Sequence, residues 1–94
     1  MVLQDQELSL RNAVSVSEAG LQAIHAGSEQ IDMTPLQIVD SAAVAVMLAW
    51  QRQAQSLNRS LQFIGVPASL ISLISLYGLT DFFKVVEVAT PERH

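Results

Sequence analysis

Short strand-like apolar segments alternate along this chain with longer segments of helical periodicity. Segments 2–10, 29–33, 61–65 and 84–89 have the length and apolar content of β-strands. Helices are predicted at 12–25, at 41–57, and between Pro67 and Gly78, which suit a first helical position and a C-terminal cap. This order predicts a small α/β domain with parallel, right-handed crossovers, in which a mixed, mostly parallel sheet of about four strands packs with about three helices.

The helix at 41–57 has two faces of different composition. The face expected to pack on the sheet is apolar and carries Ala43, Met47, Trp50, Ala54 and Leu57. The opposite face is small and apolar before it becomes basic, and it carries Ser41, Ala45, Leu48, Arg52 and Arg59. Either this outward face admits another protein closely, or its apolar residues are isolated surface residues such as soluble proteins commonly have.

Asp40 and Ser41 stand where a loop meets the start of this helix. Their side-chain oxygens can accept hydrogen bonds from the first backbone N–H groups, which have no partner within the helix. A helix start also favours negative charge, so backbone donors and the helix dipole could receive a phosphate on Ser41. Ordinary capping and a modification site are both compatible with this pattern.

The helix between Pro67 and Gly78 contains no charged residue. Its polar stripe consists of Ser69, Ser72 and Ser75, and its other side of Leu70, Leu73, Ile74 and Tyr77. A helix of this composition is expected to be well buried, although contact with a second chain would also explain it. After it, Phe82 or Phe83 is expected to cover the edge of the core.

Length and charge narrow the class of protein. A chain of 94 residues has room for one domain, spanning 1–94. With 50% hydrophobic and 15% charged residues it is more apolar than a typical soluble domain, which predicts that some apolar surface meets a partner. The net charge of −4, with no run of basic residues, argues against binding to nucleic acid.

Other residue patterns bear on compartment and chemistry. The apolar run 42–50 is far shorter than a membrane-spanning helix, and the N-terminus does not resemble a signal peptide, so we expect a cytoplasmic protein. There is no cysteine, and His25 and His94 are too far apart in sequence to suggest a metal site. We find no Gly-rich phosphate loop, catalytic triad or acid pair, and Asp32 and Asp40 suit capping, so we expect neither an enzyme nor a cofactor.

Residues 31–83 resemble STAS domains, the modules related to sulfate-transporter C-terminal domains and bacterial anti-anti-sigma factors. The family pattern places an apolar strand before an Asp-Ser or Asp-Thr pair, here Asp40-Ser41, and then a helix. A further strand, the turn Gly65-Val66-Pro67 and an apolar helix ending near Gly78-Leu79 complete the pattern in the same order. The resemblance covers more than half of the chain and implies the α/β fold described above.

Within this family the chain is most similar to the STAS subunits of Mla-type phospholipid-transport ABC complexes of Gram-negative bacteria. The resemblance implies a non-catalytic regulator that binds the MlaF-like ATPase subunit and is thereby held at the inner face of the inner membrane. The expected partner-binding residues are Asp40, Ser41, Ala45, Leu48 and Arg52. Ser41 also falls at the position that is phosphorylated in anti-anti-sigma relatives.

Two departures from the family pattern and two alternatives stay open. Ala42-Ala43 stands where relatives often have a small residue and glycine, and this difference affects how a kinase would reach Ser41. The short N-terminal region could leave a sheet edge exposed, at which a homodimer could form.

One alternative function is an anti-sigma-factor antagonist switched by a serine kinase at Ser41. Another is a binder of a small anion at the Asp40-Ser41 helix start.

Overall fold

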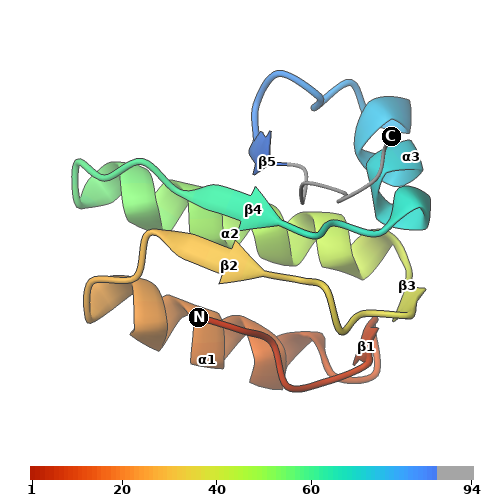
Figure 1. Cartoon of the computed structure of the whole chain (residues 1–94), viewed down its shortest axis with the longest axis horizontal. Coiled ribbons are helices and arrows are strands. Elements are labelled where there is room, and N and C mark those ends of the chain that lie inside the picture. Colours follow the sequence, from red (N-terminus) through yellow and green to blue (C-terminus); the bar gives the residue numbers. More distant parts are fainter. Residues whose placement is uncertain (87–94) are drawn as a thin grey trace, which may run out of the picture.

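Eight regular elements alternate along residues 1–86, the part of the chain that this computed structural model describes (Figure 1). The helices are α1 (Ala13–His25), α2 (Ser41–Ser56) and α3 (Ala68–Leu76). The strands are β1 (Glu7–Leu8), β2 (Gln30–Asp32), β3 (Ile38–Val39), β4 (Gln62–Ile64) and β5 (Lys84–Val86). None of the helices in this range is long and apolar enough to cross a bilayer.

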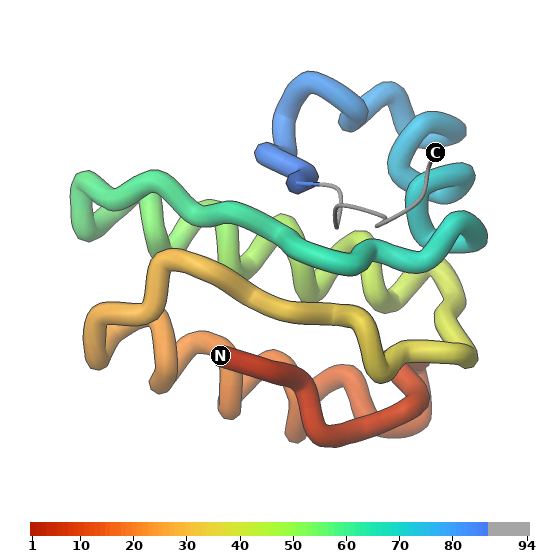
Figure 2. The backbone as a smooth tube through the Cα atoms, viewed as in Figure 1, coloured from red at the N-terminus to blue at the C-terminus, as the bar shows by residue number. Residues whose placement is uncertain are grey.

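Every strand pair among residues 1–86 is parallel, so the predicted small α/β fold is confirmed. One sheet has the order β2-β4-β5, and a separate two-stranded sheet pairs β1 with β3. Parallel neighbours require crossover connections, which α1, α2 and α3 supply. Figure 2 shows α1 and α2 running side by side in the same direction behind β2 and β4, as two successive crossover helices do.

Segment 2–10 is not the single strand that its composition predicts. Val2 forms an isolated bridge to Asp32, and only Glu7–Leu8 forms a strand further along. The exposed residues between them, Gln4 to Gln6, are polar and have no apolar alternation to hold them on the sheet. The first residues nevertheless protect part of the outer edge of β2, since Leu3 N–H donates to the Asp32 carbonyl.

One other strand prediction needs correction, and one is confirmed over the residues that the structure describes. The sequence predicts no strand at Ile38–Val39, yet these residues form β3, because β1 provides a partner that local sequence does not reveal. The strand predicted at 84–89 is confirmed over Lys84–Val86, and positions 87–89 lie outside the described residues. The sheet of about four strands is therefore divided into sheets of two and three strands in the described range.

The core lies between the helices and the β2-β4-β5 sheet. Ile31 and Phe63 are fully buried, whereas their strand neighbours Gln30 and Gln62 point to the opposite face, as the two-residue repeat requires. The ring of Phe63 stacks on Trp50 of α2 at 6.5 Å between centroids. It also meets Phe83 edge to face at 5.5 Å, and the 5% exposure of Phe83 confirms that one of the two phenylalanines covers the core.

The predicted sheet-facing side of α2 is confirmed. Ala43, Met47, Trp50 and Ala54 are at most 1% exposed, and Leu57 packs against the same cluster. Arg59, in contrast, does not belong to the outward face, because α2 ends at Ser56. Its guanidinium donates to the Ile24 carbonyl at 2.6 Å, where a cation is favoured by the C-terminal end of α1.

Helix α3 is less buried than its uncharged sequence predicts. Only Leu70 and Ile74 are buried in it, whereas Leu76 and the adjoining Tyr77 are 75% and 52% exposed. Its serine stripe is exposed as expected. Because α3 packs mainly on α2 and lies at one end of the domain (Figure 1), one side of it has no neighbour among the described residues.

Trp50 of α2 packs against Gly20 of α1. The indole Nε1–H donates to the Ser17 carbonyl at 3.0 Å, and the ring lies against the backbone of Gly20. A Cβ atom at position 20 would approach the ring closer than 3.0 Å. The fully buried ring has little room to move, so Gly20 is required by packing although glycine is a poor helix former.

We therefore expect Gly20→Ala to destabilise the protein, although the same change in an exposed helix stabilises by about 1 kcal/mol. Overpacking against Trp50 should outweigh that gain and give a net loss of about 1–2 kcal/mol in the free energy of unfolding, measured with urea. In a Trp50→Leu background, where the ring is absent, Gly20→Ala should no longer destabilise. An increase in stability from Gly20→Ala in the wild-type background would contradict this account.

The carboxylate of Asp32 caps the turn after β2. Its Oδ1 accepts hydrogen bonds from the Thr34 hydroxyl at 2.6 Å and the Thr34 backbone N–H at 2.9 Å. These two bonds lower the pKa of Asp32 below its ordinary value of 3.8, against a smaller opposing effect of desolvation. The ionised form is thus favoured in the folded protein, as a capping role requires.

A lowered pKa in the folded state means that the ionised Asp32 stabilises the protein above pH 3.8, and that this contribution is lost as pH falls through the folded-state pKa. Asp32→Asn should accordingly be less stable than wild type at pH 7, with the difference narrowing below pH 3.8. Denaturation midpoints of both proteins across this range test the prediction. A difference that is the same at pH 7 and at acidic pH would contradict it.

Candidate functional site

Asp40 joins the start of α2 to the loop that precedes α1. Its backbone is extended, its Oδ1 accepts the Ala42 N–H at 2.8 Å, and its carbonyl accepts the Ala43 N–H at 3.0 Å. Its Oδ2 accepts the Leu10 N–H at 3.1 Å from thirty residues earlier in the chain. The capping role expected of Asp40 is confirmed, and the same carboxylate also holds two distant segments together.

Ser41 is the first residue of α2 and is exposed. Because Asp40 supplies the side-chain cap, the Ser41 hydroxyl is not needed for that purpose. It lies on the surface at the N-terminal end of a 16-residue helix, where the partial positive charge of the helix is greatest. The hydroxyl is therefore accessible both to a hydrogen-bonding partner and to a modifying enzyme.

An apolar hollow of about 280 Å³ lies beside Ser41, between α2 and the end of α3. Three of the predicted site residues line it: Ser41, Ala45 and Leu48. Val44, Tyr77 and Leu79 complete the lining. We refer to this shallow depression as the α2–α3 hollow. Its lining is almost entirely apolar, and Ser41 and Tyr77 add one hydroxyl each.

Sequence reasoning did not place Val44, Tyr77 and Leu79 in the site. Tyr77 and Leu79 reach Ser41 only because α3 packs against α2, and that contact depends on the path of the chain between them. The signal that could have found them is the apolar, uncharged α3 with a tyrosine at its end. Arg52 is exposed further along α2 and does not line this hollow.

The contacts of Asp40 bear on the anion-binding alternative. Its carboxylate already accepts the Ala42 N–H, and its negative charge repels a second anion at the same helix start. Among residues 1–86 the single salt bridge joins Arg11 to Glu7 at 3.8 Å, so the nearest arginine in this loop is already paired with a carboxylate. The geometry favours an apolar protein surface over a small anion at this position.

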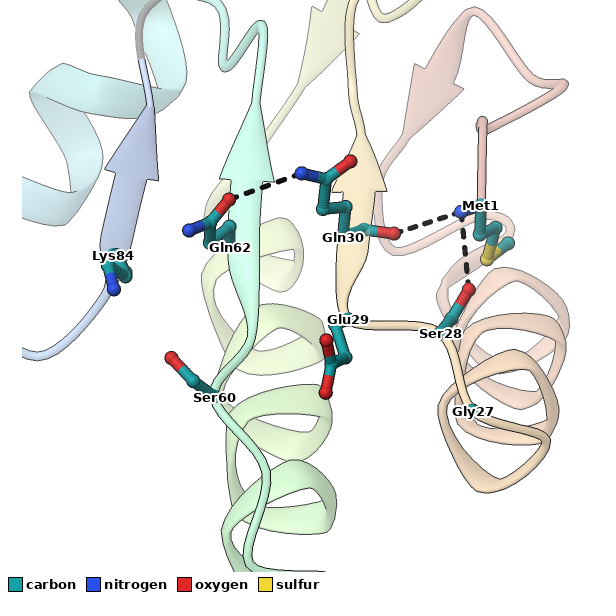
Figure 3. Close-up of a pocket in the computed structure, with 8 residues that line it drawn as sticks. All are labelled: Met1, Gly27, Ser28, Glu29, Gln30, Ser60, Gln62 and Lys84. Atoms are coloured by element: carbon teal, nitrogen blue, oxygen red, sulfur yellow. Dashed lines mark hydrogen bonds between the residues drawn. The ribbon is translucent and has the colours of Figure 1, made fainter.

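A larger polar hollow of about 500 Å³ lies at the amino ends of β2, β4 and β5 (Figure 3). Gln30 and Gln62 occupy matched positions on neighbouring strands, and Gln30 Nε2 donates to Gln62 Oε1 at 3.3 Å. Lys84 follows on β5 on the other side of Gln62. In parallel α/β sheets, ligands are typically bound at the carboxyl ends of the strands, so this end is the less favoured one.

Comparisons with known proteins identify the family and the fold of this chain. The model of the family described as "Mlab, STAS domain" matches residues 5–87. The intermembrane phospholipid transport system binding protein MlaB of Haemophilus influenzae is 33% identical over 51 residues, which are 54% of this chain and 49% of that protein. The matched region thus spans about half the length of that curated relative.

Two solved structures share the fold. A protein of Thermotoga maritima, described as a candidate anti-sigma factor antagonist, has a TM-score of 0.75 at 15% identity and is matched over 94% of this chain and 78% of its own. The anti-sigma factor antagonist SpoIIAA in its unphosphorylated form has a TM-score of 0.70 at 15% identity, over 94% of this chain and 76% of its own. At this identity the likeness concerns the fold alone. Because the family match covers most of the sequence, this chain belongs to the Mlab family of STAS domains.

Proposed function

We propose that this protein is a non-catalytic accessory subunit that binds the cytoplasmic ATPase of an Mla-type phospholipid-transport ABC transporter. The observation that carries the proposal is the α2–α3 hollow beside the exposed Ser41. A shallow surface lined by apolar side chains with few hydroxyl groups suits the core of a protein interface, where charge is depleted. The named relative in phospholipid transport supports the choice of partner.

The site would act by burying an apolar side chain of the ATPase against Ala45, Leu48 and Leu79. The Ser41 hydroxyl would hydrogen-bond to the partner at the edge of this contact, and the exposed Arg52 would lie at its rim. Asp40 would contribute chiefly by fixing the start of α2. Binding to the ATPase would hold the protein at the inner face of the inner membrane, without direct insertion of this chain into the membrane.

Leu48→Glu and Ser41→Arg should each abolish co-purification with an Mla-type transporter ATPase from the same organism. Both changes place an unpaired charge in a desolvated contact, at a cost of roughly 2–5 kcal/mol in binding free energy. Gln55→Glu, further along α2, and Ser60→Arg, before β4, introduce the same charges at exposed positions and serve as controls. Unchanged capture of both site variants would contradict the proposed interface, and no capture of the wild type would contradict the proposed partner.

An alternative function is supported by the exposure of Ser41 at the start of α2. In this alternative the protein is an anti-sigma-factor antagonist that a serine kinase inactivates. A phosphate on Ser41 would add about −1.5 to −2 charges beside the carboxylate of Asp40 and repel the partner. The same surface would thus be used, but a change of charge would control its occupancy.

Incubation with the anti-sigma kinase of the same genome distinguishes the two functions. If the alternative holds, intact-mass analysis should show one added phosphate on the wild type and none on Ser41→Ala. Phosphorylation at any of the exposed serines of α3 would persist in Ser41→Ala and is thereby separated from the reaction at Ser41. No added mass on the wild type would exclude that kinase as the regulator.

A further inference from the structure

A second apolar hollow lies between α1 and α2, on the other side of Ala45 from the α2–α3 hollow. This α1–α2 hollow has a volume of about 380 Å³, and Ala42, Ala45 and Ala49 of α2 line one side of it. Leu10 and Val14 line the other side. Because both hollows include Ala45, the first turns of α2 form a ridge between them, and a partner seated on one hollow meets the other as well.

Leu10 and Val14 are among the most exposed large apolar side chains of the described residues. Leu10, in the loop before α1, is 82% exposed, and Val14, in the first turn of α1, is 73% exposed. The position of Leu10 is maintained by its N–H bond to Asp40, so this apolar side chain is held at the surface. Exposed apolar residues that border a hollow, rather than standing alone, are typical of a protein-binding surface.

The lining of the α1–α2 hollow contains one acidic side chain. Glu18 is the charged residue in the lining, and the carboxylate of Asp40 lies at the end formed by Leu10. The nearby Arg11 is paired with Glu7, so it does not neutralise Glu18. A partner that fits this surface therefore needs an apolar side chain with a basic residue beside it.

We propose that the α1–α2 hollow binds an amphipathic helix of the partner, with one apolar side chain between Leu10 and Val14 and a lysine or arginine facing Glu18. Two helices that run side by side present a groove into which the side-chain ridge of a third helix packs. The alanines of α2 leave room for that ridge to approach. The inference rests on the proposed function, and the helix belongs to the ATPase subunit.

The test measures binding of the purified full chain to the ATPase subunit of an Mla-type transporter from the same organism, by calorimetry at two salt concentrations. Val14→Glu should weaken binding about tenfold or more, because it places a carboxylate in the apolar contact beside Glu18. Glu18→Lys should weaken binding about fivefold or more, and Glu18→Gln should reduce the salt dependence. Ser15→Glu, on another side of α1, and Glu29→Lys, before β2, are the matched controls for charge.

The outcomes separate this inference from the proposed function. If Leu48→Glu abolishes binding while Val14→Glu and Glu18→Lys bind like the wild type, the inference is wrong and the proposed function stands. If the wild type does not bind the ATPase, the proposed function and the inference both fail. Sedimentation of the chain alone tests whether a second copy of this chain fills the α1–α2 hollow instead. A dimer that Val14→Glu dissociates would show that it does and would overturn the inference.

Discussion

The contact of the Trp50 ring with the backbone of Gly20 sets the distance between α1 and α2, and the surface features of the domain depend on that distance. The ring also stacks on Phe63 of β4, so one side chain connects both helices to the sheet. Its indole N–H bond to Ser17 holds the ring in one orientation. A wider separation of the helices would open the α1–α2 hollow, and a narrower one would close it.

Asp40 has a comparable role at the end of the domain where α2 begins. A carboxylate that accepts N–H groups from both Ala42 and Leu10 fixes the helix start relative to the loop before α1. The exposed residues around it, Ser41 and Leu10, are consequently presented in a defined arrangement although neither is buried. Such preorganisation lowers the entropic cost of binding a partner.

The burial of α2 could be predicted from sequence because the 3.6-residue repeat alone decides which residues share a face; Met47 and Trp50 illustrate this. The exposure of α3 could not be predicted from its composition. Which side of an uncharged helix is buried depends on the elements that pack against it, and these come from elsewhere in the chain. For the same reason β3, a strand of two residues, is recognisable only with β1 beside it. Ser41, Ala45 and Leu48 could be grouped by helical spacing, whereas Tyr77 joins them through the docking of α3.

The parallel strand register has a consequence for the kinetics of folding. Gln62 pairs with Gln30 and with Lys84, so each strand of the main sheet meets partners more than twenty residues away, and none of these pairs can close as a hairpin. A long loop must close before each pair of strands can form. Proteins whose contacts join distant residues in this way typically fold more slowly than proteins with mainly local contacts. During synthesis β4 emerges before β5, so the backbone of Phe63 stays open to pairing with other chains until Val85 reaches it.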